Sequence, residues 1–415
     1  MRLIKNTRLT KNNDTTFSLY NNRIDKHLII SSGAAKEIER ILIDNRKPTI
    51  IENLLCSSLI DCLSNEGFID FSKERTENRF FCTKPLKTPF YLKALNIELT
   101  DSCNLRCKHC YGSFGNNKEL RFVPISWFKY NTRYLDNLQT LNITLTGGEC
   151  TLHPQFIDIC KYILEHGFQL FILTNGYNYN RVEELLEQTK EYYYTIKISL
   201  DGFDDFHDTL RGVRGCFQNV CKSLEILSNY PNIHVYLSST VMRSNLEQMA
   251  DFDDFIKRYY PFVVHTHDLI FPSHLNYSSC LESFTPSEFD HIYSVYPKVL
   301  SSNNEKSFRN FRCTGGLSQC TLMPDGKVKI CNAACDDCFY FKLNAYDRNI
   351  LDVWTDCGDN INQFRKEKNK RTKDCYECSN KKGCAVTDCR ILAKEYTGEI
   401  NRSNPVSCYI TKRGT

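Results

Sequence analysis

The sequence lacks long hydrophobic runs, and it has no large excess of either charge. No run among its 415 residues approaches the roughly 20 apolar residues needed to span a bilayer. The N-terminal stretch MRLIKNTRLTKNNDTTF has no apolar segment of the kind found in secretory signal peptides. Lysine and arginine number 53 against 49 aspartate and glutamate, a balance that argues neither for nor against an acidic partner. We therefore expect a cytoplasmic protein that acts on neither membranes nor nucleic acid.

Sequence repeats and low-complexity segments are also absent, whereas cysteine is abundant. A chain of this length predicts two or three domains. Its 22 cysteines do not suit disulfides in a reducing cytoplasm, so they indicate metal binding or catalysis. They are concentrated in two places: a trio within DSCNLRCKHCYG (residues 101–112) and a longer stretch from Cys313 to Cys408.

Residues 1–90 predict a small domain of winged-helix type, followed by a linker. Two extended candidates, FSLYNN and HLIISS, precede the helical pattern SGAAKEIERILIDNR, which has a serine at its expected N-cap. The next stretch, TIIENLLCSSLIDCLSNEGFID, predicts two further short helices and an extended tip.

Residues 91–310 predict a partial (β/α)6 barrel with a bridging segment at its end. Six strand candidates alternate with helical patterns, and they are YLKALNIELT, LNITLTGG, QLFILTNG, YTIKISLDG, IHVYLSSTVM and VVHTHDLIF. This alternation indicates a parallel sheet with right-handed crossovers, in an α/β fold related to the TIM barrel. Chemistry in such barrels lies at the C-terminal ends of the strands. The cysteine trio and the polar groups of residues 147–149, 174–176 and 199–202 follow the first four strands.

Residues 311–415 predict a cysteine-rich domain with short elements and few large apolar runs. A PDG turn, Pro324 to Gly326, lies between apolar stretches and predicts a hairpin. The region has too few apolar side chains for a sufficient core of its own, so metal–thiolate bonds would supply much of its folding energy.

Cys103, Cys107 and Cys110 allow three interpretations. A disulfide leaves one thiol over and suits the wrong compartment. A zinc site needs His109 as the fourth ligand, but His109 directly precedes Cys110, whereas zinc ligands are usually two or more residues apart. An iron–sulfur cluster with three thiolates leaves one iron open to an exogenous ligand. We favour the cluster because the trio follows the first barrel strand.

The spacing C-NLR-C-KH-C resembles the signature of the radical SAM enzymes. The resemblance implies a [4Fe–4S] cluster whose open iron binds the amino and carboxylate groups of S-adenosylmethionine. One-electron reduction of the bound cofactor would then release a 5′-deoxyadenosyl radical. His109 stands where many members carry an aromatic residue, which implies a flat ring near the adenine.

The resemblance extends to the end of the second strand, TGGE. Gly147 and Gly148 would let the backbone approach the cofactor closely, and Glu149 would accept a hydrogen bond from its ammonium group. Members of the family usually have proline next, whereas this chain has Cys150, to which we assign no role.

Four later residues are further candidates for binding the cofactor. Ser199 and Asp201 would meet the ribose, and Arg211 would pair with a carboxylate. Asn245, after the fifth strand, is a candidate for the same ligand. An ordinary loop or capping role is the alternative for all four.

The C-terminal cysteines resemble the SPASM domain that follows the barrel in many radical SAM peptide-modifying enzymes. The resemblance implies two auxiliary [4Fe–4S] clusters, and therefore three clusters in all. The first would be bound by Cys313, Cys320, Cys331 and Cys389. The second would be bound by Cys375, Cys378, Cys384 and Cys408. Two zinc sites with four thiolates each are the chemical alternative.

Two departures leave part of that assignment open. The gap AVTD before Cys389 is one residue longer than the family pattern. Cys335 and Cys338 form a further CxxC, and they either replace Cys320 or bind nothing.

The order of elements in residues 16–75 resembles the PqqD-like recognition element fused to peptide maturases. Such an element binds a leader peptide as an extra strand at a sheet edge, although a purely structural N-terminal cap is the alternative. The resemblance implies a ribosomally made precursor peptide as substrate and an external one-electron donor of the flavodoxin or ferredoxin type. We expect a Cys thioether crosslink, as in sactipeptides and ranthipeptides.

The sequence allows three alternatives to thioether formation. A carbon–carbon or carbon–oxygen crosslink belongs to the same class of reaction. An anaerobic sulfatase-maturing, formylglycine-generating enzyme would share the barrel and both auxiliary clusters, but such enzymes usually begin close to the cysteine trio. A cluster-bearing scaffold protein without chemistry would be expected to lose the trio or the GGE motif, and both are intact.

Overall fold

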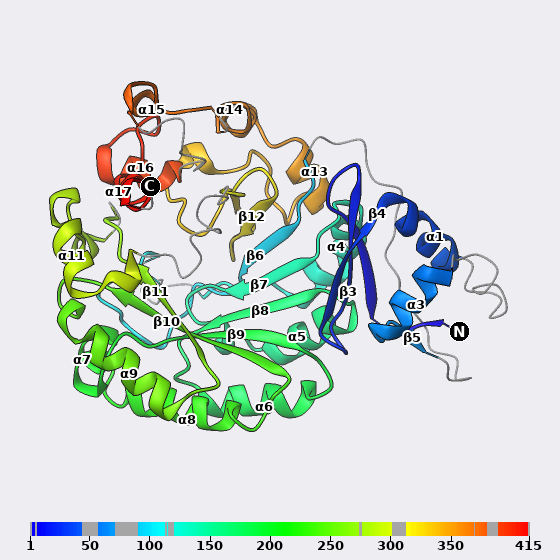
Figure 1. Ribbon diagram of the computed structural model, residues 1–415, viewed down its shortest axis with the longest axis horizontal. Coiled ribbons are helices and arrows are strands. Elements are labelled where there is room, and N and C mark those ends of the chain that lie inside the picture. Colours follow the sequence, from blue (N-terminus) through cyan, green and yellow to red (C-terminus); the bar gives the residue numbers. More distant parts are fainter. Residues whose placement is uncertain are drawn as a thin grey trace.

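The computed structural model describes residues 2–4, 6–43, 57–70, 90–112, 114, 120–273, 276–300, 313–368, 370–379 and 389–413 (Figure 1). No helix within these ranges combines the length and the apolar character needed to cross a bilayer.

The N-terminal region is built on a three-stranded antiparallel sheet. Its strands lie in the order β2 (Thr7–Lys11), β3 (Thr16–Asn21) and β4 (Lys26–Ser31). The helices α1 (Ser32–Ile43) and α3 (Ser57–Asn65) follow, and a short pair joins β1 (Arg2–Leu3) to β5 (Ile69–Asp70). The predicted strands and the helix after them are present, but β2 was not predicted. The other predicted short helix falls mainly on residues 49–56, outside the described ranges.

This region is attached to the barrel through a buried arginine of β2. The Arg8 guanidinium donates to Asp136 Oδ1 at 2.5 Å and to the carbonyl oxygens of Thr140 and His166, and it stacks over the Phe168 ring. Asn22 adds a side-chain hydrogen bond to the Leu164 carbonyl at 2.8 Å. Because these contacts are buried, the N-terminal sheet has a fixed position against the helices at this side of the barrel (Figure 1).

The central region is a mostly parallel sheet covered by helices, as the sequence predicts. Its six parallel strands are β6 (Ala94–Glu98), β7 (Asn142–Thr146), β8 (Gln169–Thr174), β9 (Tyr194–Ser199), β10 (Ile233–Val241) and β11 (Val264–Leu269). The helices between them are α4 (Ile125–Asn137), α5 (Phe156–Glu165), α6 (Tyr179–Thr189), α7 (Asp204–Arg211), α8 (Cys216–Leu227) and α9 (Met249–Tyr259). Alternate strand residues are buried against these helices, as in Tyr194, Ile196 and Ile198, which is why the strands recur with the predicted rhythm.

The sheet does not end with the barrel strands. β12 (Gln319–Leu322) pairs in parallel with β6, and β13 (Val328–Lys329) pairs antiparallel with β12, so that all eight strands form one sheet. The hairpin between β12 and β13 confirms the predicted turn, where Gly326 has φ +81°. The pairing of this hairpin with the first barrel strand was not predicted.

Short helices complete the C-terminal half of the chain. Before the hairpin lie α10 (Tyr277–Glu282) and α11 (Phe289–Val295), and after it lie α13 (Ile350–Thr355), α14 (Asp359–Glu367), α15 (Lys373–Glu377), α16 (Arg390–Thr397) and α17 (Pro405–Arg413). The hairpin and α13 contribute fully buried side chains to the same hydrophobic core as the barrel, among them Leu322, Ile350 and Trp354. These C-terminal elements therefore share a core with the barrel, which the sequence did not predict.

Candidate functional site

The cysteine trio lies on the loop that follows β6. The loop runs beside the end of α7, where the Arg106 and Lys108 amides donate to the carbonyls of Arg211 and Leu210 at 2.9 and 3.0 Å. The Asn276 side chain donates to the Lys108 and Cys110 carbonyls at 3.0 and 2.9 Å. Most of the loop's polar backbone is therefore held by the protein, which positions the three thiols.

The three thiols lie close enough to influence one another electrostatically. The pKa of Cys103 is raised to about 12, chiefly by burial, and the negative charges of Glu149, Cys107 and Cys110 add to that rise. Burial also raises the pKa of Cys107, although Arg211 opposes the rise with Nη1 3.6 Å from the sulfur. Such thiols stay protonated near neutral pH unless a cation binds them, and a metal centre supplies that positive charge.

Asp201, Arg211 and His109 form a buried charged group beside the trio. Arg211 Nη2 donates to Asp201 Oδ2 at 2.6 Å, and His109 Nε2 lies 4.0 Å from the same oxygen. Burial works to raise the pKa of Asp201, but Arg211, the two nearby histidines and the Thr240 amide outweigh it, so that the pKa is lowered. The aspartate is therefore ionised and holds the guanidinium against Cys107.

Two polar atoms of this group have no protein partner. His109 Nδ1 and Arg211 Nε are buried and form no hydrogen bond within the described ranges. Burial, followed by Arg211, lowers the pKa of His109 to about 4, so that the ring is neutral near pH 7. Buried polar atoms without partners usually mark a place where a ligand or ordered water binds.

The glycines of the TGGE motif press the end of β7 against the cysteine loop. A Cβ on Gly148 would lie 2.1 Å from the Ser102 carbonyl oxygen, and one on Gly147 would lie 2.4 Å from that of Thr100. The Gly148 amide donates to the Thr100 carbonyl at 2.8 Å. Both positions therefore require glycine for close packing of two backbone segments.

The Glu149 carboxylate is already surrounded by donors of the protein. Oε1 accepts from the Thr151 amide, the Thr151 hydroxyl and the Thr174 hydroxyl at 3.1, 2.7 and 2.7 Å. Oε2 accepts from the Asn175 amide at 2.7 Å. Because a carboxylate has about four acceptor sites, Glu149 in this arrangement joins the ends of β7 and β8.

Asn245, Ser199 and Cys150 occupy more ordinary positions. Asn245 closes the turn after β10, because its amide group donates to the carbonyls of Asp201 and Thr240 and its oxygen accepts from the Met242 amide. Ser199 is the half-buried last residue of β9. Cys150 is fully buried, with its thiol 3.3 Å from the Leu173 carbonyl, and burial raises its pKa well above the usual value. It is a core residue behind Glu149.

Three of the C-terminal cysteines come together in a second group. The pKa of Cys313 is lowered to about 5, first by a hydrogen bond from Cys389 and then by Lys368, whose Nζ lies 3.0 Å from the sulfur. The hydrogen bond with Cys313 raises the pKa of Cys389, and the negative charge of Cys331 adds to the rise. Cys313, Cys331 and Cys389 are therefore neighbours, as the sequence predicts.

Cys320, the fourth member of that predicted set, lies elsewhere. It is fully buried on β12, where burial raises its pKa and the Arg365 guanidinium partly opposes the rise. The same guanidinium donates to Cys357 Sγ at 3.1 Å. Cys320 therefore belongs to the core beside Arg365, and the structure does not bring it to the three others.

The predicted second set is described only in part, because Cys384 lies outside the described ranges. Cys375 accepts from the Thr372 hydroxyl at 3.1 Å, and Cys378 follows at the end of α15. Cys408 lies on α17. Of the remaining CxxC, Cys335 contacts the Ala333 carbonyl at 3.5 Å and Cys338 is exposed.

Tyr111 connects the two groups of thiols, and sequence reasoning missed this role. Its pKa is raised well above the usual value, first by burial and then by the charges of Glu98, Cys110, Cys335 and Cys331. The only signal in the sequence was its position directly after Cys110. The phenol therefore lies near Cys110 of the trio and near Cys331 of the second group.

Comparison with known proteins identifies the class of the barrel. Residues 97–256 match the model of the Radical SAM superfamily, and the chain therefore contains a radical SAM domain. Proteins of this superfamily use S-adenosylmethionine and a [4Fe–4S] cluster.

The similar proteins include a bacteriocin biosynthesis protein and a mycofactocin maturase. The chain is 29% identical over 194 residues to the antilisterial bacteriocin subtilosin biosynthesis protein AlbA of Bacillus subtilis (strain 168), covering 46% of this chain and 43% of AlbA. It is 31% identical over 166 residues to the mycofactocin maturase MftC of Mycolicibacterium smegmatis (strain ATCC 700084 / mc(2)155), covering 40% of this chain and 42% of MftC. The chain thus matches less than half the length of these curated relatives.

A solved structure shows a similar fold over nearly the whole chain. Streptococcus suis SuiB, in its crystal structure bound to the precursor peptide SuiA, superimposes with a TM-score of 0.62. The superposition covers 98% of this chain and 99% of SuiB at 16% sequence identity. At this identity the likeness concerns the fold alone.

The residues at the end of the barrel fit a cluster with a bound S-adenosylmethionine. Three thiols on one ordered loop suit a cluster with one open iron. The buried His109 Nδ1 and Arg211 Nε offer hydrogen-bonding atoms beside them. An imidazole nitrogen and a guanidinium N–H are suitable partners for an adenine edge and a carboxylate.

Proposed function

We propose that this chain is a radical SAM peptide maturase that installs a crosslink in a ribosomally made precursor peptide, through a Cys thioether. The convergence of the cysteine trio with the two unpartnered polar atoms at the end of the barrel supports the proposal most directly. The similarity to AlbA and MftC supports a peptide as the substrate.

Each residue beside the cysteine trio would bind a different part of the cofactor. When bound, the cluster and S-adenosylmethionine supply a 5′-deoxyadenosyl radical by one-electron reductive cleavage. Arg211 remains charged because Asp201 pairs with it, and its unpartnered Nε–H would donate to the carboxylate of the bound cofactor. The neutral His109 ring, with its hydrogen on the Nε2 that faces Asp201, would accept through Nδ1 from an amino group of the bound cofactor. The glycines of TGGE keep the cysteine loop tightly packed against the end of β7.

Thioether formation removes one hydrogen from a carbon and one from a thiol of the peptide. The radical takes the first as a hydrogen atom, and the thiol gives up a proton. One electron remains and has to leave the peptide. Cys313, Cys331 and Cys389 would hold the cluster that accepts it, and Tyr111 lies near both groups of thiols. An external flavodoxin- or ferredoxin-type donor supplies the electron that starts each cleavage.

Within the part of the chain that the structure describes, no strand pairs with the outer edge of β4, which offers a place for the leader of the peptide. β4 is the outer strand of the sheet, and its side chains are mostly exposed, with Ile29 at 62%. The opposite strand, β2, is covered by the barrel through Arg8. A leader would therefore add as a further strand on β4, with main-chain hydrogen bonds for affinity and Ile29 for apolar contact.

The test is co-expression of the chain with short cysteine-bearing reading frames next to its gene, followed by mass spectrometry. We expect a peptide that loses two hydrogen atoms and whose cysteine no longer reacts with an alkylating reagent. Loss of two hydrogens with a reactive cysteine would indicate a carbon–carbon or carbon–oxygen crosslink, and loss of the cysteine sulfur would indicate formylglycine. Replacement of Cys103, Cys107 and Cys110 by alanine should abolish 5′-deoxyadenosine formation, and cleavage that survives contradicts the cofactor assignment.

A further inference from the structure

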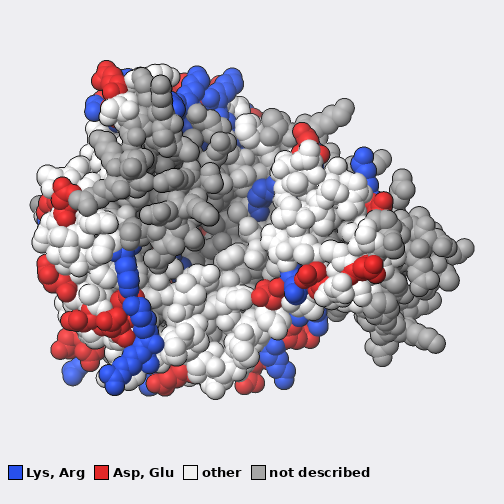
Figure 2. All heavy atoms as spheres, viewed as in Figure 1, with Lys and Arg blue, Asp and Glu red and all other residues white. Residues whose placement is uncertain are grey.

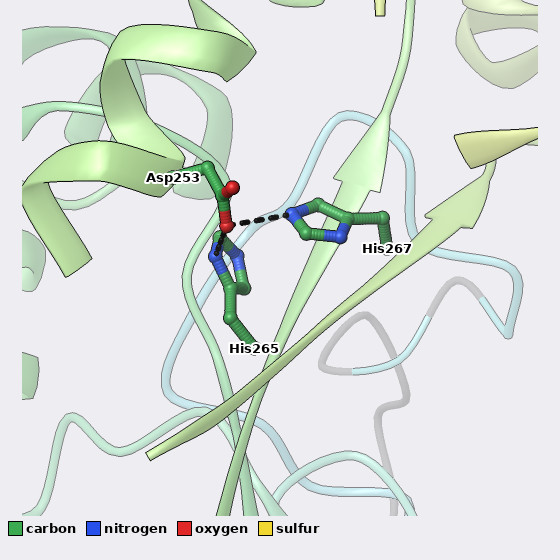
Figure 3. Close-up of side chains that lie close together, drawn as sticks. All are labelled: Asp253, His265 and His267. Carbon is green, nitrogen blue, oxygen red and sulfur yellow. Dashed lines mark hydrogen bonds and ion pairs between the residues drawn. The ribbon is translucent and has the colours of Figure 1, made fainter. Parts of the chain in front are cut away.

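A group of two histidines and one aspartate lies on the helix-facing side of the last barrel strand. His265 and His267 are two residues apart on β11, so they point to the same side, and Asp253 reaches them from α9 (Figure 3). All three side chains are at least 95% buried, since their exposed fractions are 4–5%. They line one side of a cavity of about 280 Å³ together with Ile256 and Val263.

The separations of the three donor atoms match the edges of a coordination polyhedron. His265 Nδ1 lies 3.0 Å and His267 Nε2 lies 3.8 Å from the same oxygen, Asp253 Oδ1. Ligands held about 2.0–2.2 Å from one metal ion are about 3.0–3.5 Å apart at the usual angles. One separation falls at that value, and the other is a few tenths of an ångström longer. Tyr296 Oη, 2.9 Å from His267 Nε2, adds an oxygen at the same place.

A neighbouring serine fixes the tautomer of His265. The Ser239 hydroxyl donates to the Leu200 carbonyl oxygen, so toward His265 Nε2, 2.8 Å away, it accepts. The hydrogen of a neutral His265 is then on Nε2, and its Nδ1 lone pair faces the Asp253 carboxylate. Two lone pairs that face each other at 3.0 Å require a proton or a metal ion between them. A hydrogen bond from the outer nitrogen to the protein is also the usual support of a metal-binding histidine.

We propose that Asp253 Oδ1, His265 Nδ1 and His267 Nε2 bind one divalent transition-metal ion of the Zn²⁺ class. Two nitrogens and one carboxylate oxygen suit Zn²⁺ and its neighbours in the first row. Among the described residues, no other three histidines, cysteines or carboxylates place their donor atoms this close together. The site contains no thiolate, and it joins β11 to α9 on the outside of the barrel. It stands independently of the proposed activity.

Two lysines set the affinity of the site. Lys257 Nζ lies 2.9 Å from Asp253 Oδ2, and Lys298 contacts the same oxygen, whereas Oδ1 faces the histidines. These ammonium groups keep the carboxylate ionised, but they also repel a second cation. Removing one of the lysines should therefore raise the affinity for the metal ion by tenfold or more. If the three residues formed only an ion-pair network, removing a lysine would not raise the affinity for a metal ion.

The test uses cluster-reconstituted protein, in which iron occupies the thiolate sites. After washing with a chelator, we would titrate Zn²⁺ and record zinc per chain and X-ray absorption at the zinc edge. We expect one additional zinc with nitrogen and oxygen neighbours at about 2.0–2.1 Å and no sulfur at about 2.3 Å. The double variant His265→Ala/His267→Ala should lose it. His291→Ala, which replaces an exposed histidine on α11, should retain it.

Lys298→Met keeps the experiment informative if the histidine variant folds poorly. It should bind Zn²⁺ at least tenfold more tightly than the unmodified chain, a gain that misfolding does not produce. The proposal is overturned if the zinc carries a sulfur shell, if the double variant binds as much zinc as the parent, or if Lys298→Met leaves the affinity unchanged. In that case a proton joins His265 to Asp253.

Discussion

At the scale of single residues, the structure brings several of the predicted cofactor-binding residues together, but the contacts among them were not predicted. Asp201, Arg211 and His109 were each predicted as cofactor-binding residues, and the structure brings them together beside Cys107. Their mutual ion pair was not foreseen, because Asp201 and Arg211 are ten residues apart and are joined by the turn into α7. Glu149 and Asn245 were also predicted to bind the cofactor, but in the structure their side chains form hydrogen bonds within the protein. The Glu149 carboxylate accepts from nearby backbone amides and hydroxyls, and the Asn245 side chain bonds to two backbone carbonyls and one amide. These contacts depend on turn geometry that a sequence pattern does not reveal.

His207 predicts a loss of stability in mild acid. Its Nδ1 accepts a hydrogen bond from the Asp201 amide at 3.2 Å, and burial, followed by Arg211, lowers its pKa to about 3. The unfolded chain, with a histidine pKa near 6.5, therefore binds more protons than the folded chain between about pH 3 and 6.5. Stability falls as the pH drops through this window, by up to about 1.4 kcal/mol per pH unit.

The check is the melting temperature of cluster-loaded protein between pH 5 and 7. His207→Gln, which retains an acceptor but does not titrate, should reduce the dependence of melting temperature on pH. His291→Gln, at an exposed position, should leave that dependence unchanged. Equal slopes for His207→Gln and the unmodified protein would contradict the assignment.

At the scale of elements, periodicity was a reliable guide inside the barrel. All six predicted barrel strands are present, because each is a short run of apolar and β-branched residues between helical patterns. β2 was missed because its sequence, TRLTK, is rich in polar residues, although Thr7, Arg8 and Thr10 are buried and Arg8 is bonded to the barrel. The short β12 was recognised as half of a hairpin, but its partner β6 lies far away in the sequence.

β4 predicts a measurable binding defect. The variant Ile29→Asp places a charge on the exposed edge strand without disturbing a buried contact. We expect the affinity for the precursor peptide to fall by tenfold or more, because an apolar contact and the approach of the leader strand are both impaired. Leu281→Asp, with a leucine of similar exposure on α10, is the control.

Fluorescence anisotropy with labelled leader peptide measures the effect, and melting curves check that both variants fold. An unchanged affinity for Ile29→Asp would exclude leader addition at β4. Uncoupled cleavage of S-adenosylmethionine should remain in Ile29→Asp, since β4 is remote from the cysteine loop (Figure 1).

At the scale of the whole molecule, the net charge is small, at +4. On the face shown in Figure 2, lysine and arginine side chains lie next to aspartate and glutamate side chains. Charge therefore offers no guide to the path of a peptide across this face. The cysteines, in contrast, fall into two separate groups. The C-terminal hairpin is joined to the barrel by a buried ion pair between Lys329 and Glu98, which lie 2.9 Å apart.

The thiol inventory of the chain predicts its iron content. Reconstituted protein should hold about twelve irons, as three four-iron clusters. Cys331→Ala should lose about four of them, because Cys331 lies with Cys313 and Cys389. Cys320→Ala should lose none, because Cys320 is a core residue beside Arg365. Iron analysis and Mössbauer spectroscopy provide the count, and equal losses in the two variants would restore Cys320 to the ligand set.

The pairing of β6 with β12 has a consequence for folding during synthesis on the ribosome. The first barrel strand is synthesised roughly 220 residues before the strand that lies at its outer edge. Until that neighbour emerges, the nascent chain exposes one unpaired side of β6 directly beside the cysteine loop. The thiols of the trio and the unpaired edge of β6 are therefore exposed during the same period of synthesis. A chaperone that covers this edge would also protect the thiols from oxidation.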